Sequence, residues 1–400
     1  MFKKGIIYIL LNYMIQFLNI LFNLLLMKYL NSYQLGSLAL AKTWQQFVDY
    51  SHLGARFSLD RYIPVAKEEE KKYLVATVLF TTFIGALFVF LAAIIFNKAD
   101  IVVSILTASG VFIAVGNIVK AYYRATNSLT EMLKLVFYNQ LLPLLISIVV
   151  YFYTLDFNFY LVSLLASYLF FAFILFYRER ELFHFIKYER IKRVIKEIAV
   201  PSFLLFINSL VVFLYLVMDR FFIDYSNGRE ELGHYSIILF AFSALMIIPA
   251  SVAELLFVKI IKQSCESGKR FFWKETFITL GITLVGVIVA NFCMDYFVTK
   301  YTNYSFLIPQ MHMATFAVIP FALTSIYYHV MNGLDLRIQI ILINFFTCIG
   351  LSIYYFYPIL MGQRYDLNYY LYAKICTGWF IFFGYILCII FSNVQKNYLR

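Results

Sequence analysis

Five polar side chains interrupt the apolar segment 34–57 at regular intervals. Successive members are four, three, three and four residues apart, so on an α-helix they fall within an arc of about 120°. Their ammonium, amide, carboxylate, imidazole and guanidinium groups bind anions, exchange protons and form ion pairs. We therefore predict one polar stripe, which faces a wet cavity or is buried against a neighbouring helix through ion pairs. Its members are Lys42, Gln46, Asp49, His52 and Arg56.

Three cations lie inside long apolar runs: Lys42, Arg220 and Lys374. At a rise of 1.5 Å per residue, Lys42 lies roughly 12 Å from the outer end of its predicted helix, Lys374 at about the same depth and Arg220 somewhat shallower. A charge at bilayer depth costs about 2.5–3.5 kcal/mol on insertion scales, so it normally faces water or a partner. The three predict a cationic chamber suited to an anionic ligand, unless each side chain extends to the headgroup region.

The composition indicates that these residues are set in membrane-spanning helices. Of 400 residues, 62% are hydrophobic and 14% are charged, whereas soluble domains carry about 25% charged residues. The apolar residues form runs of the length, about 20 residues, that crosses a bilayer. The five cysteines show neither metal-ligand nor disulfide spacing, so we predict no metal and no cofactor beyond a coupling ion, H⁺ or Na⁺.

Twelve such runs predict an all-α integral membrane protein. The first run is longer than a signal-peptide core and lacks a cleavage site, so we expect it to be retained as a span. The predicted spans are 5–30, 34–57, 73–96, 101–123, 133–154, 157–177, 199–224, 231–258, 274–297, 303–332, 337–358 and 366–391.

The distribution of basic residues predicts the orientation. With the N-terminus inside, most of the 33 lysines and arginines fall in cytoplasmic loops, and the outer loops and helix ends hold five. This asymmetry satisfies the positive-inside rule and places both termini in the cytoplasm. It also assigns the net charge of +11 to a membrane surface, so we predict no nucleic-acid partner. The five outer residues are Lys28, Lys98, Arg229, Lys300 and Arg364.

Acidic groups suggest further roles. Asp219 precedes Arg220, so the two point about 100° apart; Asp219 either pairs with a neighbouring helix or carries a coupling proton or cation. Glu254 is expected near the cytoplasmic side with Asp49, His52 and Arg56, where ion pairs would close an inner gate. Interfacial anchoring is the alternative for Arg56. We assign structural roles to His312 and His329 in the tenth span.

The two halves of the chain resemble each other weakly, which suggests a duplication. Segments ending at Gly36 and Gly233 align, as do segments beginning at Tyr122 and Tyr327, with nearly equal shifts of about half the chain. Because six spans in each half share one orientation, the symmetry axis would run along the membrane normal. The predicted domains are a six-helix lobe 1–177, a basic amphipathic cytoplasmic linker 178–198 and a six-helix lobe 199–400.

Two stretches of sequence resemble the O-antigen and capsule flippases, the polysaccharide exporters of the multidrug/oligosaccharidyl-lipid/polysaccharide superfamily. The stretch MDRFFIDYSNGREELGHYSIILFAFSALMIIPASVAELLFVKIIKQ is similar to the start of their C-terminal half, and YQLGSLALAKTWQQFVDYSHLGARFSL to their first turn between spans. The matching positions are Asp219-Arg220, Leu232-Gly233-His234-Tyr235, Lys259 to Lys262, Leu35-Gly36 and Leu53-Gly54.

The resemblance implies two lobes, as in MATE transporters, around a cavity lined by spans one, two, seven and eight. It also implies a substrate, an oligosaccharide linked to undecaprenyl pyrophosphate, whose charged pyrophosphate would be drawn to Lys42, Arg220 and Lys374. The protein would lie in the inner membrane of a bacterium, with a polysaccharide polymerase and a chain-length regulator as partners in lipopolysaccharide or capsule assembly.

Two rival functions differ in the residues they require. A multidrug or metabolite antiporter that binds cations would favour carboxylates inside the membrane, whereas basic residues outnumber them in the outer half of the predicted spans. A membrane-embedded polymerase, ligase or acyltransferase generally needs a large outer loop, and the predicted outer loops are short. The sequence also lacks GxxxxGK[ST], so ATP is not the expected energy source. We therefore predict a secondary transporter rather than an enzyme.

Overall fold

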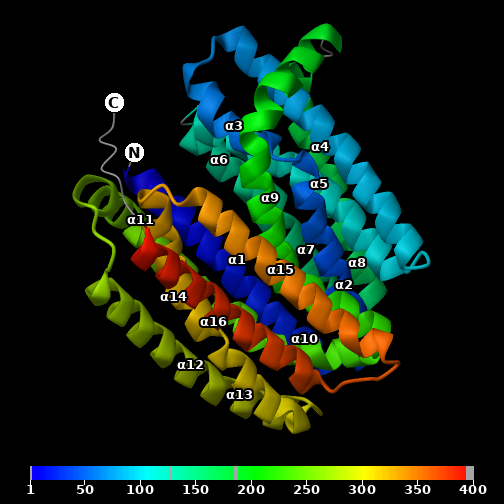
Figure 1. Cartoon of the computed structure of the whole chain (residues 1–400). Coiled ribbons are helices and arrows are strands. Elements are labelled where there is room, and N and C mark those ends of the chain that lie inside the picture. Colours follow the sequence, from blue (N-terminus) through cyan, green and yellow to red (C-terminus); the bar gives the residue numbers. More distant parts are fainter. Residues whose placement is uncertain (1, 127, 184–187, 393–400) are drawn as a thin grey trace. The chain divides into compact units, whose positions relative to one another are not determined.

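The computed structural model describes residues 2–126, 128–183 and 188–392, and in these residues the protein consists of helices joined by short loops (Figure 1). The α-helices in the first half are α1 (Phe2–Tyr29), α2 (Ser32–Val48), α3 (Ala55–Tyr62), α4 (Glu68–Phe96), α5 (Ile101–Ala125), α6 (Leu129–Val136), α7 (Leu142–Thr154) and α8 (Phe157–Arg178). Those in the second half are α9 (Tyr188–Ser226), α10 (Arg229–Leu245), α11 (Ile247–Ser267), α12 (Trp273–Tyr301), α13 (Ile308–Phe316), α14 (Val318–Gly333), α15 (Arg337–Leu360) and α16 (Leu367–Phe391). Short 3₁₀ or π segments are η1 (Asp49–His52), η2 (Ile63–Val65), η3 (Phe137–Leu141), η4 (Arg180–Phe183) and η5 (Ser305–Leu307).

Long apolar helices make this a multi-pass membrane protein. Among the described residues, nine helical stretches are long and apolar enough to cross a bilayer, and Met14–Tyr29 forms a shorter apolar helix. Two of the predicted spans, 34–57 and 231–258, begin with the 17-residue helices α2 and α10, which are shorter than a full crossing. The all-α prediction is confirmed, and the number of twelve spans stays a prediction.

The contacts between residues divide the chain into two compact units. Unit 1 contains Met1–Leu25 and Ser37–Leu210, and unit 2 contains Leu26–Gly36 and Val211–Arg400. The chain therefore passes from unit 1 into unit 2 and back again near its beginning, around the start of α2. The last transfer lies inside α9, after Leu210.

Unit 1 is built around α5. This helix packs against α3, α4, α6 and α8, while α7 packs along α8. Small and β-branched residues fill the contact: Val75 and Val78 of α4 and Ile118 and Val119 of α5 are at most 1% exposed. The outward faces of these helices stay apolar, as lipid-facing surfaces require.

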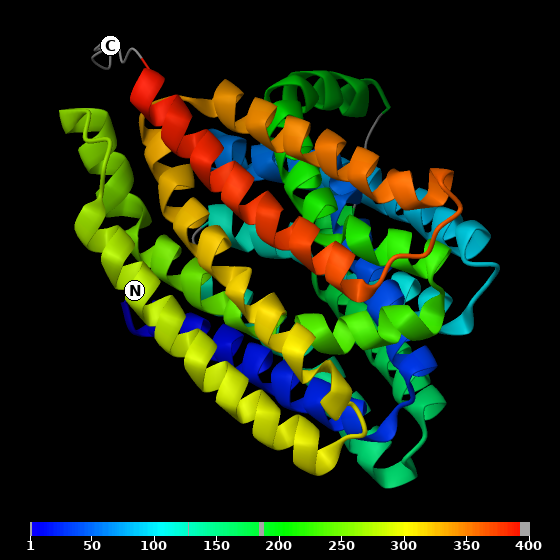
Figure 2. The same ribbon diagram turned by 60° about the horizontal axis from the view of Figure 1, so that its bottom comes forward.

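Unit 2 is built around α14. Helices α11, α12 and α16 pack against α14, and α10 packs against α13. Figure 2 shows α15 and α16 side by side, joined by the loop 361–366, and these two helices are also in contact.

Two of the predicted spans are interrupted four residues before a proline. Helix α10 ends at Leu245, four residues before Pro249, and α13 ends at Phe316, four residues before Pro320. Proline has no N–H to donate to the carbonyl four residues earlier, and its ring crowds that carbonyl. The predicted span 231–258 is therefore divided between α10 and α11, and 303–332 between α13 and α14, with a single residue, Met246 or Ala317, between the two helices.

The predicted linker 178–198 does not form a separate helix in its described part. Arg180–Phe183 form η4, residues 184–187 lie outside the described residues, and 188–198 are the first turns of α9. The predicted seventh span continues the same 39-residue helix without interruption.

Candidate functional site

A buried ion pair joins three helices of unit 2. The ammonium Nζ of Lys374, on α16, lies 2.7 Å from Oδ2 of Asp219, on α9, and these side chains are 3% and 1% exposed. The hydroxyl of Tyr235, on α10, donates to the same Oδ2 at 2.6 Å. Lys374 also donates to the carbonyl oxygen of Leu216 at 2.9 Å. Each charge therefore meets an opposite charge and a hydrogen-bond partner, which burial in a low-dielectric interior requires.

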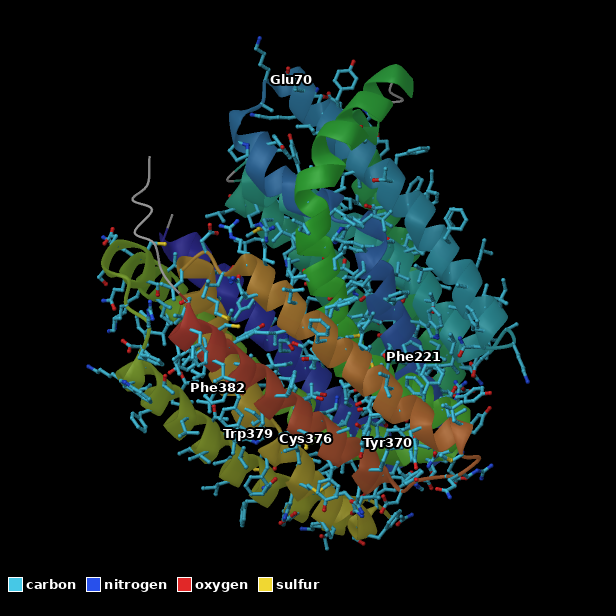
Figure 3. The ribbon with its side chains drawn as sticks, in the orientation of Figure 1. Glu70, Phe221, Tyr370, Cys376, Trp379 and Phe382 are labelled. Atoms are coloured by element: carbon cyan, nitrogen blue, oxygen red, sulfur yellow. The ribbon has the colours of Figure 1, made fainter. Side chains whose placement is uncertain are left out.

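Aromatic rings surround this ion pair. Lys374 Nζ lies 5.4 Å from the centre of the Phe242 ring, a cation–π distance. The Tyr370 ring packs in a tilted arrangement against Tyr355, with ring centres 5.4 Å apart, and edge-to-face against Tyr235, at 6.3 Å. Figure 3 labels Tyr370 on α16, one turn from Lys374. The rings exclude water, so the Asp219–Lys374 attraction acts at close range with little screening.

The sequence predicted both residues but not their contact. Lys374 was expected in a cavity that binds an anion, and the structure gives it an intramolecular anion, Asp219, as its partner. Asp219 was expected either to pair with a neighbouring helix or to carry a coupling ion, and the geometry provides the first. Tyr235 was missed as a polar partner; its place in the LGHY stretch, sixteen residues after Asp219, was the available signal.

Arg220 follows Asp219 on α9. Its backbone N–H donates to Asp219 Oδ1 at 2.9 Å, and its side chain is half-buried. Neighbouring residues on a helix diverge by about 100°, so Arg220 and Asp219 serve different surroundings. A substrate contact for Arg220 stays a prediction.

In unit 1, Lys42 is held by the first helix. Its ammonium donates to Asn23 Oδ1 on α1 at 2.7 Å, and the side chain is half-buried. Gln46, one turn later on α2, is exposed. Asn23 was not predicted, although a signal was available: it is the last of four amides in the first apolar run, Asn12, Gln16, Asn19 and Asn23, which are spaced by four, three and four residues.

The predicted polar stripe does not continue past Val48. Helix α2 ends there, η1 is a 3₁₀ turn, Leu53 has φ of 47° and Gly54 has φ of 87°. Regular α-helical geometry begins again only with α3. The helix face that carries Lys42 and Gln46 on α2 is therefore not continued to the residues after Val48. The members of the predicted stripe over 34–57 therefore do not lie on one uninterrupted helix, and their shared role stays a prediction.

The lower members of the predicted stripe form two local structures. Asp49 pairs with Arg56 at 2.9 Å and accepts from Asn117 Nδ2 on α5 at 2.8 Å. His52 is 4% exposed, and its Nδ1 accepts from the backbone N–H of Gly54 at 2.9 Å. Asp49 and Arg56 therefore fix the bend onto α5, and a gating role for them stays a prediction. Glu254 lies on α11, and its side chain is outside the described residues.

Two glycines make a reciprocal backbone contact at the start of α2 and of α10. A Cβ atom on Gly36 would lie 1.9 Å from the carbonyl oxygen of Arg229, and one on Gly233 would lie 1.8 Å from that of Ser32. The weak sequence repeat aligns Gly36 with Gly233, and the same shift aligns Ser32 with Arg229. Equivalent residues of the two halves thus exchange equivalent contacts, as a local twofold axis produces.

Comparison with solved structures defines the fold. The chain is similar to an inward-facing multidrug resistance MATE family transporter of the MOP superfamily, with 14% identity, a TM-score of 0.65 and 96% of each chain covered. It is also similar to the lipid II flippase MurJ in its inward closed conformation, with 14% identity and a TM-score of 0.68 over 98% of this chain and 89% of that one. A eukaryotic MATE transporter matches with a TM-score of 0.52 at 13% identity, over 96% and 92% of the two chains. At such identities the likeness establishes the fold, which is that of MATE and MurJ.

The sequence also matches a family. Residues 1–260 match the family described as polysaccharide biosynthesis protein, and no curated protein matches the chain. Because this match covers more than half of the chain, the protein belongs to that family.

Proposed function

We propose that this protein is a flippase that moves an oligosaccharide linked to undecaprenyl pyrophosphate from the cytoplasmic to the outer leaflet of a bacterial inner membrane. Both termini would lie in the cytoplasm, and the mechanism would be alternating access. The observation that carries the proposal is the polysaccharide biosynthesis match over residues 1–260. A glycan assembled on a lipid inside the cell must cross the bilayer before it can be displayed outside.

The fold supports a transported rather than a chemically altered substrate. The proteins of similar fold are named as transporters or as a flippase, and one of them as a lipid II flippase. A lipid-linked saccharide is therefore a cargo that this fold accommodates in another protein.

The half-buried cations support an anionic group on that cargo. Lys42 and Arg220 each lie on a helix of a predicted span and are partly accessible. A guanidinium binds phosphate oxygens in a bidentate manner, and an ammonium supplies a mobile point charge. We propose that each attracts the pyrophosphate, while Lys374 stays paired with Asp219.

The alternative is a multidrug or metabolite antiporter, which the MATE-like fold also permits. A cationic drug would need an accessible carboxylate. Asp219 is 1% exposed and bound to Lys374, and Asp49 is bound to Arg56. The buried and paired Asp219 therefore favours the flippase over the antiporter.

Complementation tests the proposal. A strain deleted for the gene should lose surface polysaccharide, and the wild-type gene should restore it. The double variant Lys42→Ala, Arg220→Ala should reach the membrane in normal amount and restore less than about a tenth of the display. Lys300→Ala, which removes an exposed cation from α12, is the matched control and should restore display fully.

Two other results of the complementation experiment would lead to different conclusions. Normal polysaccharide in the deletion strain, together with increased sensitivity to cationic drugs, would support the antiporter instead. Full activity of the double variant would remove the cation assignment and leave the flippase proposal standing.

A further inference from the structure

Basic and aromatic side chains gather in unit 2 where α11 ends and α12 begins (Figure 1). Residues 259–275 cover the last turns of α11, the loop 268–272 and the first residues of α12. They include five basic and two acidic residues, which gives the segment a net charge of +3. We call this segment the basic junction. Its basic residues are Lys259, Lys262, Lys269, Arg270 and Lys274, and its acidic residues are Glu266 and Glu275.

Two contacts hold the basic junction in place. The ammonium of Lys259, on α11, forms an ion pair with Glu275, on α12, whose side chain is 6% exposed. The guanidinium of Arg270 donates through Nη2 to the carbonyl oxygen of Ser392 at 2.8 Å, directly after the end of α16. The segment is therefore fixed to two neighbouring helices, and the buried carboxylate of Glu275 is neutralised within the protein.

The other three cations of the basic junction are exposed. Lys269 Nζ lies 4.5 Å from the centre of the Phe272 ring. Within residues 2–126, 128–183 and 188–392, neither Lys262 nor Lys274 forms an ion pair or a hydrogen bond through its side chain. One of these lysines follows Lys259 by three residues, and the other directly precedes its acidic partner, so both lie near the ion pair. Their charges are therefore available to an anion from outside the chain.

Stacked aromatic rings lie beside these cations. Trp273, the first residue of α12, stacks on Phe271 with ring centres 5.7 Å apart and on Phe277 at 6.4 Å. Trp273 and Phe277 are 61% and 65% exposed, so this row of rings faces outward. Tryptophan is enriched where membrane meets water, because its ring is apolar and its N–H is polar. The start of α12 therefore has the composition of a membrane–water interface.

The length of α12 places its ends at the same level. It is a candidate span of 29 residues, which makes it about 43 Å long, whereas the hydrocarbon core of a bilayer is about 30 Å thick. Both ends therefore reach the headgroup layer. Exposed apolar side chains continue along the helix from the row of rings, and they include Ile278, Ile282 and Val285. Lipid chains thus cover the helix directly beside the basic junction.

We propose that the basic junction binds the headgroup phosphate of an anionic phospholipid. Lys262 and Lys274 contact the phosphate, while Trp273 and Phe277 pack against the upper part of the acyl chains. A net charge of +3 favours a lipid with a net negative charge over one whose phosphate is balanced by its own amine. The exposed rings favour a lipid over a soluble polyanion, because a soluble ligand would leave them without an apolar partner.

A bound headgroup would connect the ends of three helices. Its phosphate would join α11 to α12 through the two lysines, and Arg270 already joins the same segment to the end of α16. Anionic lipid is therefore expected to stabilise unit 2. This lipid site is independent of the proposed transport activity, because Lys42 and Arg220 take no part in it.

Fluorescence quenching by brominated lipids tests the site where it lies. The chain has three tryptophans, and replacing two of them by Trp44→Phe and Trp379→Phe leaves Trp273 as the only one. The full-length protein is reconstituted in mixtures of phosphatidylglycerol and phosphatidylcholine, with one or the other brominated in the upper part of its acyl chains. The two quenching curves give the relative binding constant of the two lipids at Trp273. If this background does not fold, the difference between wild type and Trp273→Phe isolates the same signal.

The expected result is a preference for phosphatidylglycerol of at least about threefold, since two lysines attract it. The double variant Lys262→Gln, Lys274→Gln should bring the ratio to about one, and Lys262→Arg, Lys274→Arg should keep the preference. Lys300→Gln is the matched control, because it removes an exposed lysine from the opposite end of α12, and it should leave the ratio unchanged.

Four results would overturn the site. Equal quenching by the two lipids in wild type would remove the preference for an anion. No quenching by either would show that Trp273 does not meet lipid chains. A preference that survives the glutamine substitutions would exclude the two lysines. A preference that excess inorganic phosphate abolishes at constant ionic strength would show that the junction takes the free anion rather than a lipid.

Discussion

Removing the Lys374 ammonium should destabilise the protein strongly. In Lys374→Met the carboxylate of Asp219 still accepts hydrogen bonds from the Tyr235 hydroxyl and the Arg220 backbone N–H. It loses the opposite charge that lay 2.7 Å away. With Asp219 only 1% exposed, water cannot replace that charge. Breaking a buried pair at one partner costs about 3–5 kcal/mol. For a unit of this size, each kcal/mol shifts Tm by about 2–4 °C, so Tm should fall by roughly 6–20 °C.

A series of variants separates the contributions. Adding Asp219→Leu to Lys374→Met removes the unpaired charge, so much of the lost stability should return. The Tyr235 hydroxyl then lacks its acceptor, an unsatisfied buried group that costs about 1–3 kcal/mol. Adding Tyr235→Phe should recover that part too. The expected order of Tm is therefore single variant lowest, double variant higher and triple variant highest below wild type.

Thermal unfolding in detergent, followed by size-exclusion chromatography of a fluorescent fusion, measures this order. Lys300→Met, which removes an exposed lysine of α12, is the control and should change Tm by no more than a degree or two. The reasoning is refuted if Lys374→Met is no less stable than this control. It is also refuted if the triple variant melts as low as the single one.

Two further predictions concern the glycine contact and the unit 1 ion pair. Gly36→Ala and Gly233→Ala should each reduce the yield of folded protein severely, because each new methyl group would lie under 2 Å from a backbone oxygen; Gly281→Ala, where nothing lies within 4 Å, should be neutral or slightly stabilising. Single-variant membrane yields equal to that of Gly281→Ala would contradict the contact. Asp49→Ala and Arg56→Ala should show a coupling of roughly 0.2–1 kcal/mol in a double-mutant cycle, since both side chains are about one-third exposed. Additive effects in the thermal assay would rule this coupling out.

The helical architecture was predictable because a bilayer imposes it. Apolar runs of the length that spans a membrane must satisfy every backbone group internally, which a helix does without reference to the rest of the chain. The helix ends at Leu245 and Phe316 could also have been predicted from the sequence. Each lies four residues before a proline, and the rule that proline weakens that position is local. The predicted continuous spans overlooked this rule.

The bend after Val48 was harder to predict. Leu53 adopts a left-handed conformation that a leucine rarely takes, and its N–H donates to the carbonyl oxygen of Tyr50. Gly54 follows with φ of 87°, where a Cβ would lie 2.7 Å from the carbonyl oxygen of Ser202. That neighbour is distant in the sequence, so the helical periodicity of 34–57 could not reveal it.

The candidate site shows the same limit. The sequence could identify Lys374 and Asp219 as charges in apolar runs, because each is unusual within its own segment. Their pairing depends on which helices lie side by side, and that information is not carried by the spacing within either run. A cation at bilayer depth was therefore interpreted as available to a ligand, whereas its nearest anion belongs to the same chain.

The place of residues 26–36 in unit 2 has a consequence for biosynthesis. This segment leaves the ribosome near the start of translation, but its backbone partners at the start of α10 follow about 200 residues later. At 5–20 residues per second, the interval is roughly 10–40 s. During that time the segment is inserted without its glycine contact, while much of unit 1 is already complete. Unit 2 therefore finishes folding only with a segment made at the very beginning, and a C-terminal half synthesised separately would need residues 26–36 from the N-terminal half to complete unit 2.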